Sequence, residues 1–285
     1  MIRHAPSIGL GIGLSLRGSG ARFSGILDQY AGAAAAYSLR ALSSAWLAGD
    51  VVEVRRSSDS TTQSFTANEV SNGTLEAFCG AGDGFVSTWY DQSGNGNDAT
   101  QATTTKQPKI VSAGALVADG IDFDNVDDTL VTINIDSFGT SSRSVFSVCS
   151  PDSVTANAET IVQLAPGGTA GEGWNVNPEL ATRTNSTTWI SSTPASTLKN
   201  NLVTGIYTSG NLHAGNSMWL DGVSVVRTSG NDGSINTITS QIHIGASAGS
   251  AVFDGIISEI IIYKSDQSAN RTGIETNIND HYSIY

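Results

Sequence analysis

The chain has 285 residues, of which 39% are hydrophobic and 14% charged, and its formal net charge is −12. This apolar share can bury a core, so the composition excludes an intrinsically disordered chain. The acidic balance excludes a nucleic-acid backbone as partner, because phosphate binding needs a surplus of Lys and Arg. No run of the roughly 18 apolar residues that a membrane helix needs occurs, so no transmembrane span is predicted.

Residues 1–25 differ from the rest of the chain. Arg3 gives this segment a basic start, and an apolar run interrupted by alternating glycines follows. Those glycines disfavour the helix of a secretory signal, which is the alternative interpretation. We predict an extended arm that adds to the sheet edge of another subunit, so that the chain forms a homo-oligomer. The predicted assembly contacts are Ile8, Leu10, Ile12, Leu14 and Leu16.

From residue 26 onward the predicted elements alternate between helix and strand. Residues 33–45 are alanine-rich, with apolar side chains at helical spacing, and predict a helix. Residues 51–56 predict a strand, and a short helix capped by Asn68 follows over 68–78. The β-branched and aromatic residues of 85–90 alternate and predict the next strand.

The second half of the chain contains short strands separated by turns such as Asp221-Gly222. This pattern is typical of a sandwich and not of a parallel sheet. Residues 268–282 predict a closing helix, because Ile274, Ile278 and Tyr282 recur every four positions. The strands are predicted near 130–135, 144–150, 160–164, 173–176, 187–190, 201–208, 217–220, 223–228, 241–244 and 255–263.

A loop rich in Asp, Asn, Ser and Gly follows the strand at 85–90. Its side-chain oxygens lie close together along the chain, which suits a sugar or a hard cation. The alternative is that these side chains bond their own backbone and hold no ligand. The predicted glycan-binding residues of this loop are Tyr90, Asp91, Gln92, Asn95, Asn97 and Asp98.

Two further groups of residues are candidates for binding. Trp174 and Trp189 lie near turn-rich stretches and are the predicted stacking platform for a glycan. Asp122, Asp124 and Asp127 form part of an acidic cluster and are the predicted ligands of a calcium ion. No organic cofactor is predicted, because no phosphate-binding glycine loop and no zinc spacing occurs.

Four segments carry a resemblance to a known family: residues 35–40, 54–59, 77–79 and 89–98. They resemble the start of the catalytic domain of α-L-arabinofuranosidase B, and the similarity extends over about residues 34–107. The same block is common in virion proteins of tailed bacteriophages, where it serves as a lectin-like module. The resemblance implies an all-β fold, a concanavalin A-like antiparallel β-sandwich (jelly roll). We expect it to span 26–285, with short helices near the start and a C-terminal helix.

The resemblance leaves the catalytic residues unassigned. A retaining glycosidase needs two carboxyl groups across the scissile bond, and Glu172 and Asp254 are the candidates. The family shapes its sugar pocket with two adjacent cysteines, whereas this chain has only Cys79 and Cys149. Pairing of these two cysteines stays open. We therefore expect no appreciable hydrolysis of arabinofuranosides.

The function predicted from these observations is that of a virion structural protein of a tailed bacteriophage, in the tail, tail tip or fibre. Its sandwich would bind host-surface polysaccharide or neighbouring virion subunits, after assembly in the host cytoplasm. One alternative is a secreted glycoside hydrolase of the α-L-arabinofuranosidase type. Another is a capsid decoration protein that binds no sugar.

Overall fold

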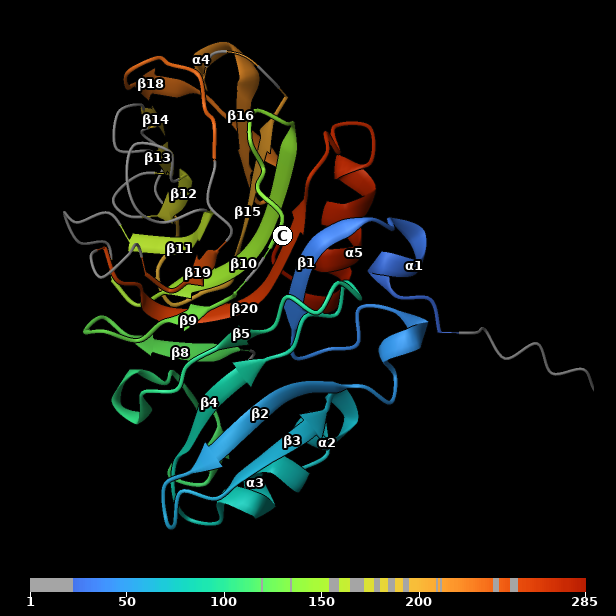
Figure 1. The fold of residues 1–285 in the computed structure, drawn as a ribbon, viewed down its shortest axis with the longest axis vertical. Helices are drawn as coiled ribbons and strands as arrows, with labels where there is room; N and C mark the ends of the chain where they lie inside the picture. Colours follow the sequence, from blue (N-terminus) through green and yellow to red (C-terminus); the bar gives the residue numbers. More distant parts are fainter. Residues whose placement is uncertain are drawn as a thin grey trace, which may run out of the picture.

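The computed structural model describes residues 23–118, 120–133, 135–153, 159–164, 172–176, 180–183, 188–191, 195–208, 210, 212–237, 241–246 and 251–285. The assembly contacts predicted between Ile8 and Leu16 lie outside the described residues. The chain is mostly β, and all pairings between its named strands are antiparallel (Figure 1).

Two layers of strands make up the upper part of the molecule in Figure 1. The first layer has β20 in the middle, with β8 and β1 along one edge and β10, β15, β16 and β17 following on the other. The second layer runs in the order β9, β19, β11, β12, β13, β14 and β18. The first-layer bounds are β1 Ala33–Ser38, β8 Ile121–Asp124, β10 Arg143–Pro151, β15 Asn201–Tyr207, β16 Asn216–Leu220, β17 Val223–Val225 and β20 Asp254–Tyr263. Those of the second are β9 Leu130–Val131, β11 Glu159–Leu164, β12 Glu172–Val176, β13 Ala181–Arg183, β14 Thr188–Ser191, β18 Arg227–Ser229 and β19 Ile242–Ile244.

A smaller lobe below the layers connects to both of them. Its strand β4 pairs through β5 to the second layer and through β6 to the first. The lobe's strands are β2 Asp50–Arg56, β3 Thr62–Thr66, β4 Gly84–Trp89, β5 Ala99–Thr100, β6 Lys109–Ser112 and β7 Ala115–Leu116. The described helices are α1 Ile26–Gln29, α2 Ala67–Ser71, α3 Thr74–Cys79, α4 Leu212–Gly215 and α5 Arg271–Tyr282, with 3-10 turns at Ser44–Trp46 and Thr104–Lys106.

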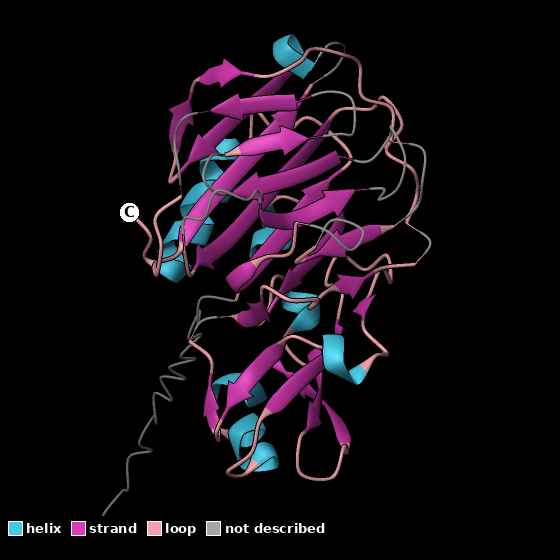
Figure 2. Cartoon of the chain, turned by 90° about the vertical axis from the view of Figure 1, so that its left-hand side faces the viewer, coloured by secondary structure: helices cyan, strands magenta, loops and turns pink. Residues whose placement is uncertain are grey.

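The core has two parts. The larger one extends from the lobe into the space between the layers and includes Trp89, Trp174 and Met218. The smaller one lies under α5, whose Ile274 and Ile278 pack beside Phe146. Figure 2 shows α5 running along the strands of the sandwich. The prediction of an antiparallel β-sandwich with short helices near the start and a helix at the C-terminus is confirmed.

One predicted element is wrong. The alanine-rich segment at 33–45 begins as strand β1 and not as a helix, and β1 pairs with β20 along Ala33–Tyr263 to Ser38–Glu259. Alanine favours a helix in isolation, but tertiary pairing overrides so small a preference. Most of β1 is buried on both faces, and small side chains fit there. Among the described residues, no helix has the length and apolar character to span a membrane.

The helix predicted over 68–78 is split into α2 and α3. The cap of α2 is Thr66 and not Asn68: its hydroxyl accepts a bond from the Glu69 amide, and the Glu69 carboxylate accepts from the Thr66 amide at 2.9 Å. This reciprocal pair is a capping box, so the prediction of Asn68 as the cap is wrong.

Candidate functional site

The polar loop at 90–98 is fastened to β1 by Asp91. This carboxylate is 1% exposed and accepts from the backbone amides of Ala36 at 2.9 Å, Ser93 at 2.9 Å and Asn97 at 3.0 Å. It also accepts from the Ser93 hydroxyl at 2.7 Å. Four bonds to one buried carboxylate leave it without a face for a sugar, so Asp91 holds the loop in place.

Three more predicted loop residues are occupied in the same way. Gln92 is 2% exposed, and its amide bonds the Leu42 amide and the carbonyls of Ser38 and Arg40 at 2.8–2.9 Å. Asp98 accepts from the Asp91 amide at 2.9 Å, and the Tyr90 hydroxyl bonds the Ser64 hydroxyl at 2.9 Å. The self-bonding alternative therefore describes most of this loop.

Asn95 and Asn97 are the two predicted loop residues that line a pocket. The pocket has a volume of about 440 Å³ and also includes Asp136 and Lys264. A second pocket of about 530 Å³ lies beside α2 and the end of α5, with Arg40, His281 and Tyr282 in its wall. Its remaining lining is mostly aliphatic, which suits packing more than sugar hydroxyls.

The tryptophan platform is not formed in this structure. Trp174 is 0% exposed and Trp189 3% exposed, and both belong to the core between the layers. The Trp174 indole lies against Gly205, where a Cβ would come within 2.0 Å of Nε1. An indole stacks on a sugar only through an accessible face, so these two residues are corrected to core positions.

Two buried carboxylates, those of Glu259 and Glu275, are paired with arginines. Glu259 is 0% exposed and takes two bonds from Arg40, at 2.7 and 2.8 Å, and one from the Ser38 hydroxyl at 2.9 Å. Glu275 is paired with Arg271. The Glu259 carboxylate, which takes all three of the bonds given above, positions the chain and is not free for acid–base chemistry. The side chain of the candidate Glu172 lies outside the described residues, although its backbone opens β12.

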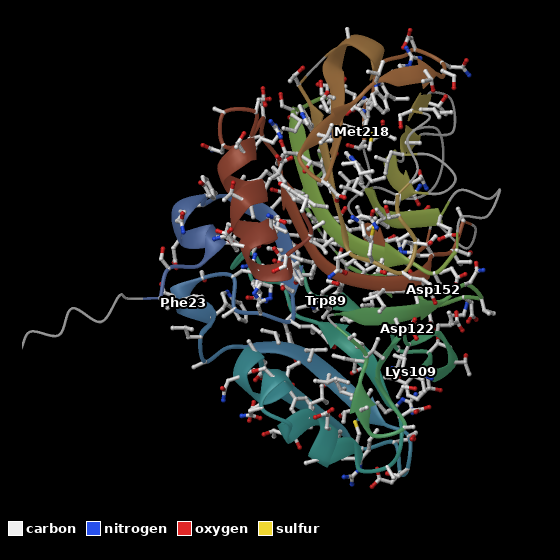
Figure 3. All side chains as sticks on the ribbon, turned by 180° about the vertical axis from the view of Figure 1, so that it is seen from behind. Phe23, Trp89, Lys109, Asp122, Asp152 and Met218 are labelled. Carbon is white, nitrogen blue, oxygen red and sulfur yellow. The ribbon has the colours of Figure 1, made fainter. Side chains whose placement is uncertain are left out.

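Asp254, the second catalytic candidate, lies in a group of acidic residues at the start of β20. We name Asp122, Asp152 and Asp254 the acidic edge. Burial raises the pKa of Asp122, and the negative charge of Asp152 raises it further, whereas the positive charge of Lys109 lowers it. Burial and then Asp254 raise the pKa of Asp152. Figure 3 shows Asp152, Asp122 and Lys109 following one another along the same side of the molecule.

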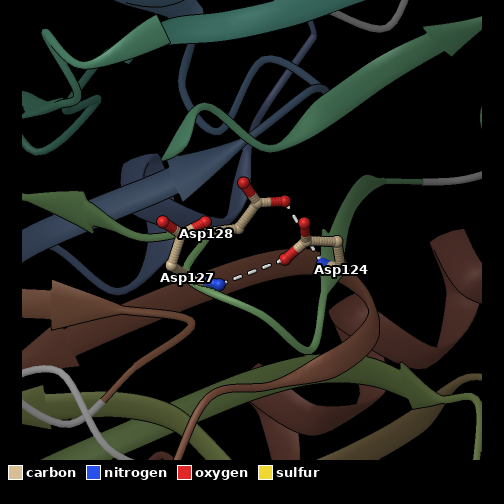
Figure 4. Close-up of side chains that lie close together, drawn as sticks. All are labelled: Asp124, Asp127 and Asp128. Carbon is tan, nitrogen blue, oxygen red and sulfur yellow. Dashed lines mark hydrogen bonds between the residues drawn. The ribbon is translucent and has the colours of Figure 1, made fainter. Parts of the chain in front are cut away.

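Two of the three predicted calcium ligands, Asp124 and Asp127, lie together in the structure, and calcium binding itself stays a prediction. Ligand oxygens of Asp124, Asp127 and Asp128 lie within 4.8 Å of one another, whereas Asp122 is not in this group (Figure 4). The Asp124 carboxylate accepts from the Asp127 amide at 3.3 Å, and Asp128 accepts from the Asp124 amide at 3.2 Å. Burial, together with the charge of Asp124, raises the pKa of Asp128 to about 7. Asp128 belongs to the same acidic cluster of the sequence but was not among the predicted ligands, because the sequence does not show that its side chain is only 6% exposed.

Both cysteines are free and buried, so Cys79 and Cys149 do not pair. Burial raises the pKa of each thiol. A buried thiol with a raised pKa is a packing residue and not a nucleophile.

Comparisons with known proteins agree with this architecture. Residues 28–133 match the family model described as the catalytic domain of α-L-arabinofuranosidase B. A GH54 α-L-arabinofuranosidase mutant soaked with 4-nitrophenyl α-L-arabinofuranoside superposes with a TM-score of 0.66, at 15% identity over 88% of this chain. An arabinofuranosidase complexed with arabinofuranosyl-α-1,2-xylobiose gives a TM-score of 0.64, at 16% identity over 88% of this chain. This chain shares their fold.

The chain spans 63% of the length of each of those arabinofuranosidase chains. No curated protein matches. The block recognised in the sequence at about 34–107 falls within the matched residues 28–133, so the resemblance to an arabinofuranosidase-like domain is supported. The predicted virion context stays a prediction.

Proposed function

We propose that this chain is a glycoside hydrolase domain of the α-L-arabinofuranosidase type. The observation that carries the proposal is the family-model match over residues 28–133, together with the arabinofuranosidase fold shared over 88% of the chain. This reverses the order of the sequence-based interpretations, in which the hydrolase was the alternative.

The acidic edge offers two carboxyl groups for the reaction. In the pairing of β8 with β20, Asp254 lies opposite Asp124, and Asp122 lies opposite Ile256. Asp122 and Asp254 are therefore diagonal neighbours on one face, with Cα atoms about 7–8 Å apart. From such positions carboxyl groups reach the separation of about 5–5.5 Å that a retaining mechanism uses. Both side chains are partly exposed, so a substrate can reach them.

The two groups would take different roles. The raised pKa of Asp122 keeps a proton on its carboxyl group at higher pH, as the acid that protonates the leaving oxygen requires. Asp254, which accepts from the Ser153 hydroxyl at 3.3 Å, would act as the nucleophile. In the second step the Asp122 carboxylate would take a proton from water as the glycosyl ester is hydrolysed.

The test is turnover of 4-nitrophenyl α-L-arabinofuranoside by the purified full chain. Asp122→Asn and Asp254→Asn are each expected to lower kcat/KM by about 10²–10⁴-fold. Asp280→Asn, an exposed change on α5, is the matched control, and Glu172→Ala tests the other sequence candidate. Asp122→Asn should also remove the fall in rate toward alkaline pH. The proposal is contradicted if the wild-type chain shows no turnover, or if Asp122→Asn and Asp254→Asn both keep wild-type activity.

A second candidate function is glycan binding without hydrolysis, in a virion tail or decoration protein. The observation that favours it is the separation of Cys79 and Cys149, which leaves this chain without the adjacent-cysteine pair that the resemblance implies for the sugar pocket. Retention of the chain by bacterial surface polysaccharide, with no turnover of the nitrophenyl substrate, would select this function.

A further inference from the structure

The pocket of about 440 Å³ lies at the opposite end of β20 from the acidic edge. Asp254 begins β20 and Lys264 directly follows it, so the ten-residue strand separates the two places by about 30 Å. The pocket is therefore distinct from the proposed catalytic residues. The lining residues that matter are Ala33, Ala34, Asn95, Asn97, Asp136 and Lys264.

Two asparagines are fixed in the wall of this pocket. The Asn95 Nδ2 atom donates to the Ala33 carbonyl at 2.9 Å, and the Asn97 Nδ2 atom donates to the Ala34 carbonyl at 2.8 Å. Because the nitrogen end of each amide is held by β1, the Oδ1 end is the acceptor that remains for a ligand. Asn97 is only 8% exposed, and its backbone is held by Asp91. These acceptors are in place before any ligand arrives.

The charges of the described lining residues sum to zero. Asp136 adds a carboxylate and Lys264 an ammonium group, and both side chains are exposed. A hydroxyl group can donate to the carboxylate or to an asparagine oxygen and accept from the ammonium. An anionic sugar would instead meet Asp136 and a chain of net charge −12. The chemistry fits a neutral polyhydroxyl ligand.

Size and apolar lining agree with a small sugar. Pockets for small ligands fall in the range of about 300–1,000 Å³. Ile135, at 4% exposure, and the half-buried Ala34 give the C–H face of a ring an apolar contact. None of the described lining residues is aromatic, so stacking adds nothing and the affinity should be millimolar.

We propose that this pocket is a non-catalytic subsite for a neutral mono- or disaccharide unit. Asn95 and Asn97 present the acceptors, and Asp136 and Lys264 supply the charge-assisted bonds. The subsite is independent of the proposed reaction, since binding requires no carboxyl group with a raised pKa.

The experiment is an NMR titration of the isotopically labelled full chain with L-arabinose, D-xylose and D-galactose, and with sialic acid as the anionic comparison. We expect saturable shifts at Gly32–Ala34 and at Asn95–Asn97 with at least one neutral sugar. Asp136→Asn and Lys264→Gln should each weaken that binding by about five- to tenfold. No hydrogen bond of either side chain is seen among the described residues, so the fold should persist. Asp280→Asn is the control and should leave the binding unchanged.

Several outcomes overturn the subsite. They are an absence of saturable shifts up to tens of millimolar, tighter binding of sialic acid, or unchanged binding in Asp136→Asn and Lys264→Gln. Asp254→Asn should lose turnover of the nitrophenyl substrate and keep the saturable shifts at Gly32–Ala34 and Asn95–Asn97, while Asp280→Asn should leave both readouts unchanged. Failure of the subsite and failure of the proposed hydrolase are therefore separate results.

Discussion

Replacement of Asp91 by Ala tests whether the polar loop at 90–98 has a structural role or binds a sugar. The change removes the acceptor of three backbone amides, those of Ala36, Ser93 and Asn97. An unsatisfied buried donor costs about 1–3 kcal/mol. Water can reach the partly exposed Ser93, so the amides of Ala36 and Asn97 account for most of the loss. We therefore expect the free energy of unfolding to fall by roughly 3–5 kcal/mol, a large share of the roughly 5–15 kcal/mol typical of a domain.

The measurement is urea unfolding followed by tryptophan fluorescence, since Trp89 lies two residues before Asp91. Asp91→Asn keeps the volume and one carbonyl acceptor, so its loss should be smaller, roughly 1–3 kcal/mol. Asp280→Ala, at an exposed helix position, is the control and should stay within about 0.5 kcal/mol. If Asp91→Ala unfolds like the wild type and loses only sugar binding, the structural role argued for Asp91 is wrong.

Three further predictions concern stability and assembly. The pKa of Asp128 is about 7 in the folded chain against about 3.8 for an ordinary Asp, so its stabilising contribution is complete below about pH 3.8 and is lost as the pH rises through 7. Asp128→Asn should therefore raise the free energy of unfolding by roughly 1–3 kcal/mol at pH 8 and leave it unchanged at pH 3.5, which urea titrations at the two pH values would show. Gly205→Ala should lower the melting temperature, at a cost of roughly 1–3 kcal/mol, because the new methyl group would overlap the Trp174 indole; an unchanged melting temperature in calorimetry would contradict this packing. Deletion of residues 1–20 should leave a folded chain that no longer assembles in light scattering, whereas an unfolded product would place the segment in the core.

Local signals predicted well where local chemistry decides the structure. The alternating segments 51–56 and 85–90 form β2 and β4, as predicted. The segment with apolar residues at every fourth position, 268–282, forms α5. The resemblance predicted the sandwich correctly. Of the two interpretations of the polar loop, the one in which its side chains bond its own backbone describes most of the loop.

The failures have a common cause, which is that partners far along the chain decided the result. The alanines of β1 form a strand because β20, more than 200 residues later, pairs with them. Trp174 lies in a turn-rich sequence, but the absent side chain of Gly205 on another strand makes room for it in the core. Asp136 and Lys264 carry no motif, so the pocket that they share with Asn95 and Asn97 was not found from the sequence.

The central place of β20 also determines the order in which the chain can fold. Asp254–Tyr263 pairs with β1, β8 and β10, so the middle strand of one layer is synthesised after all three of its neighbours. Until then β1 and β10 expose edges that invite pairing with other chains. Loop closure over such separations is slow, so folding should be slow and dependent on the synthesis of β20. A fragment that ends with the block at 28–133 would keep the most recognisable sequence of this protein and lack the strand that completes its core.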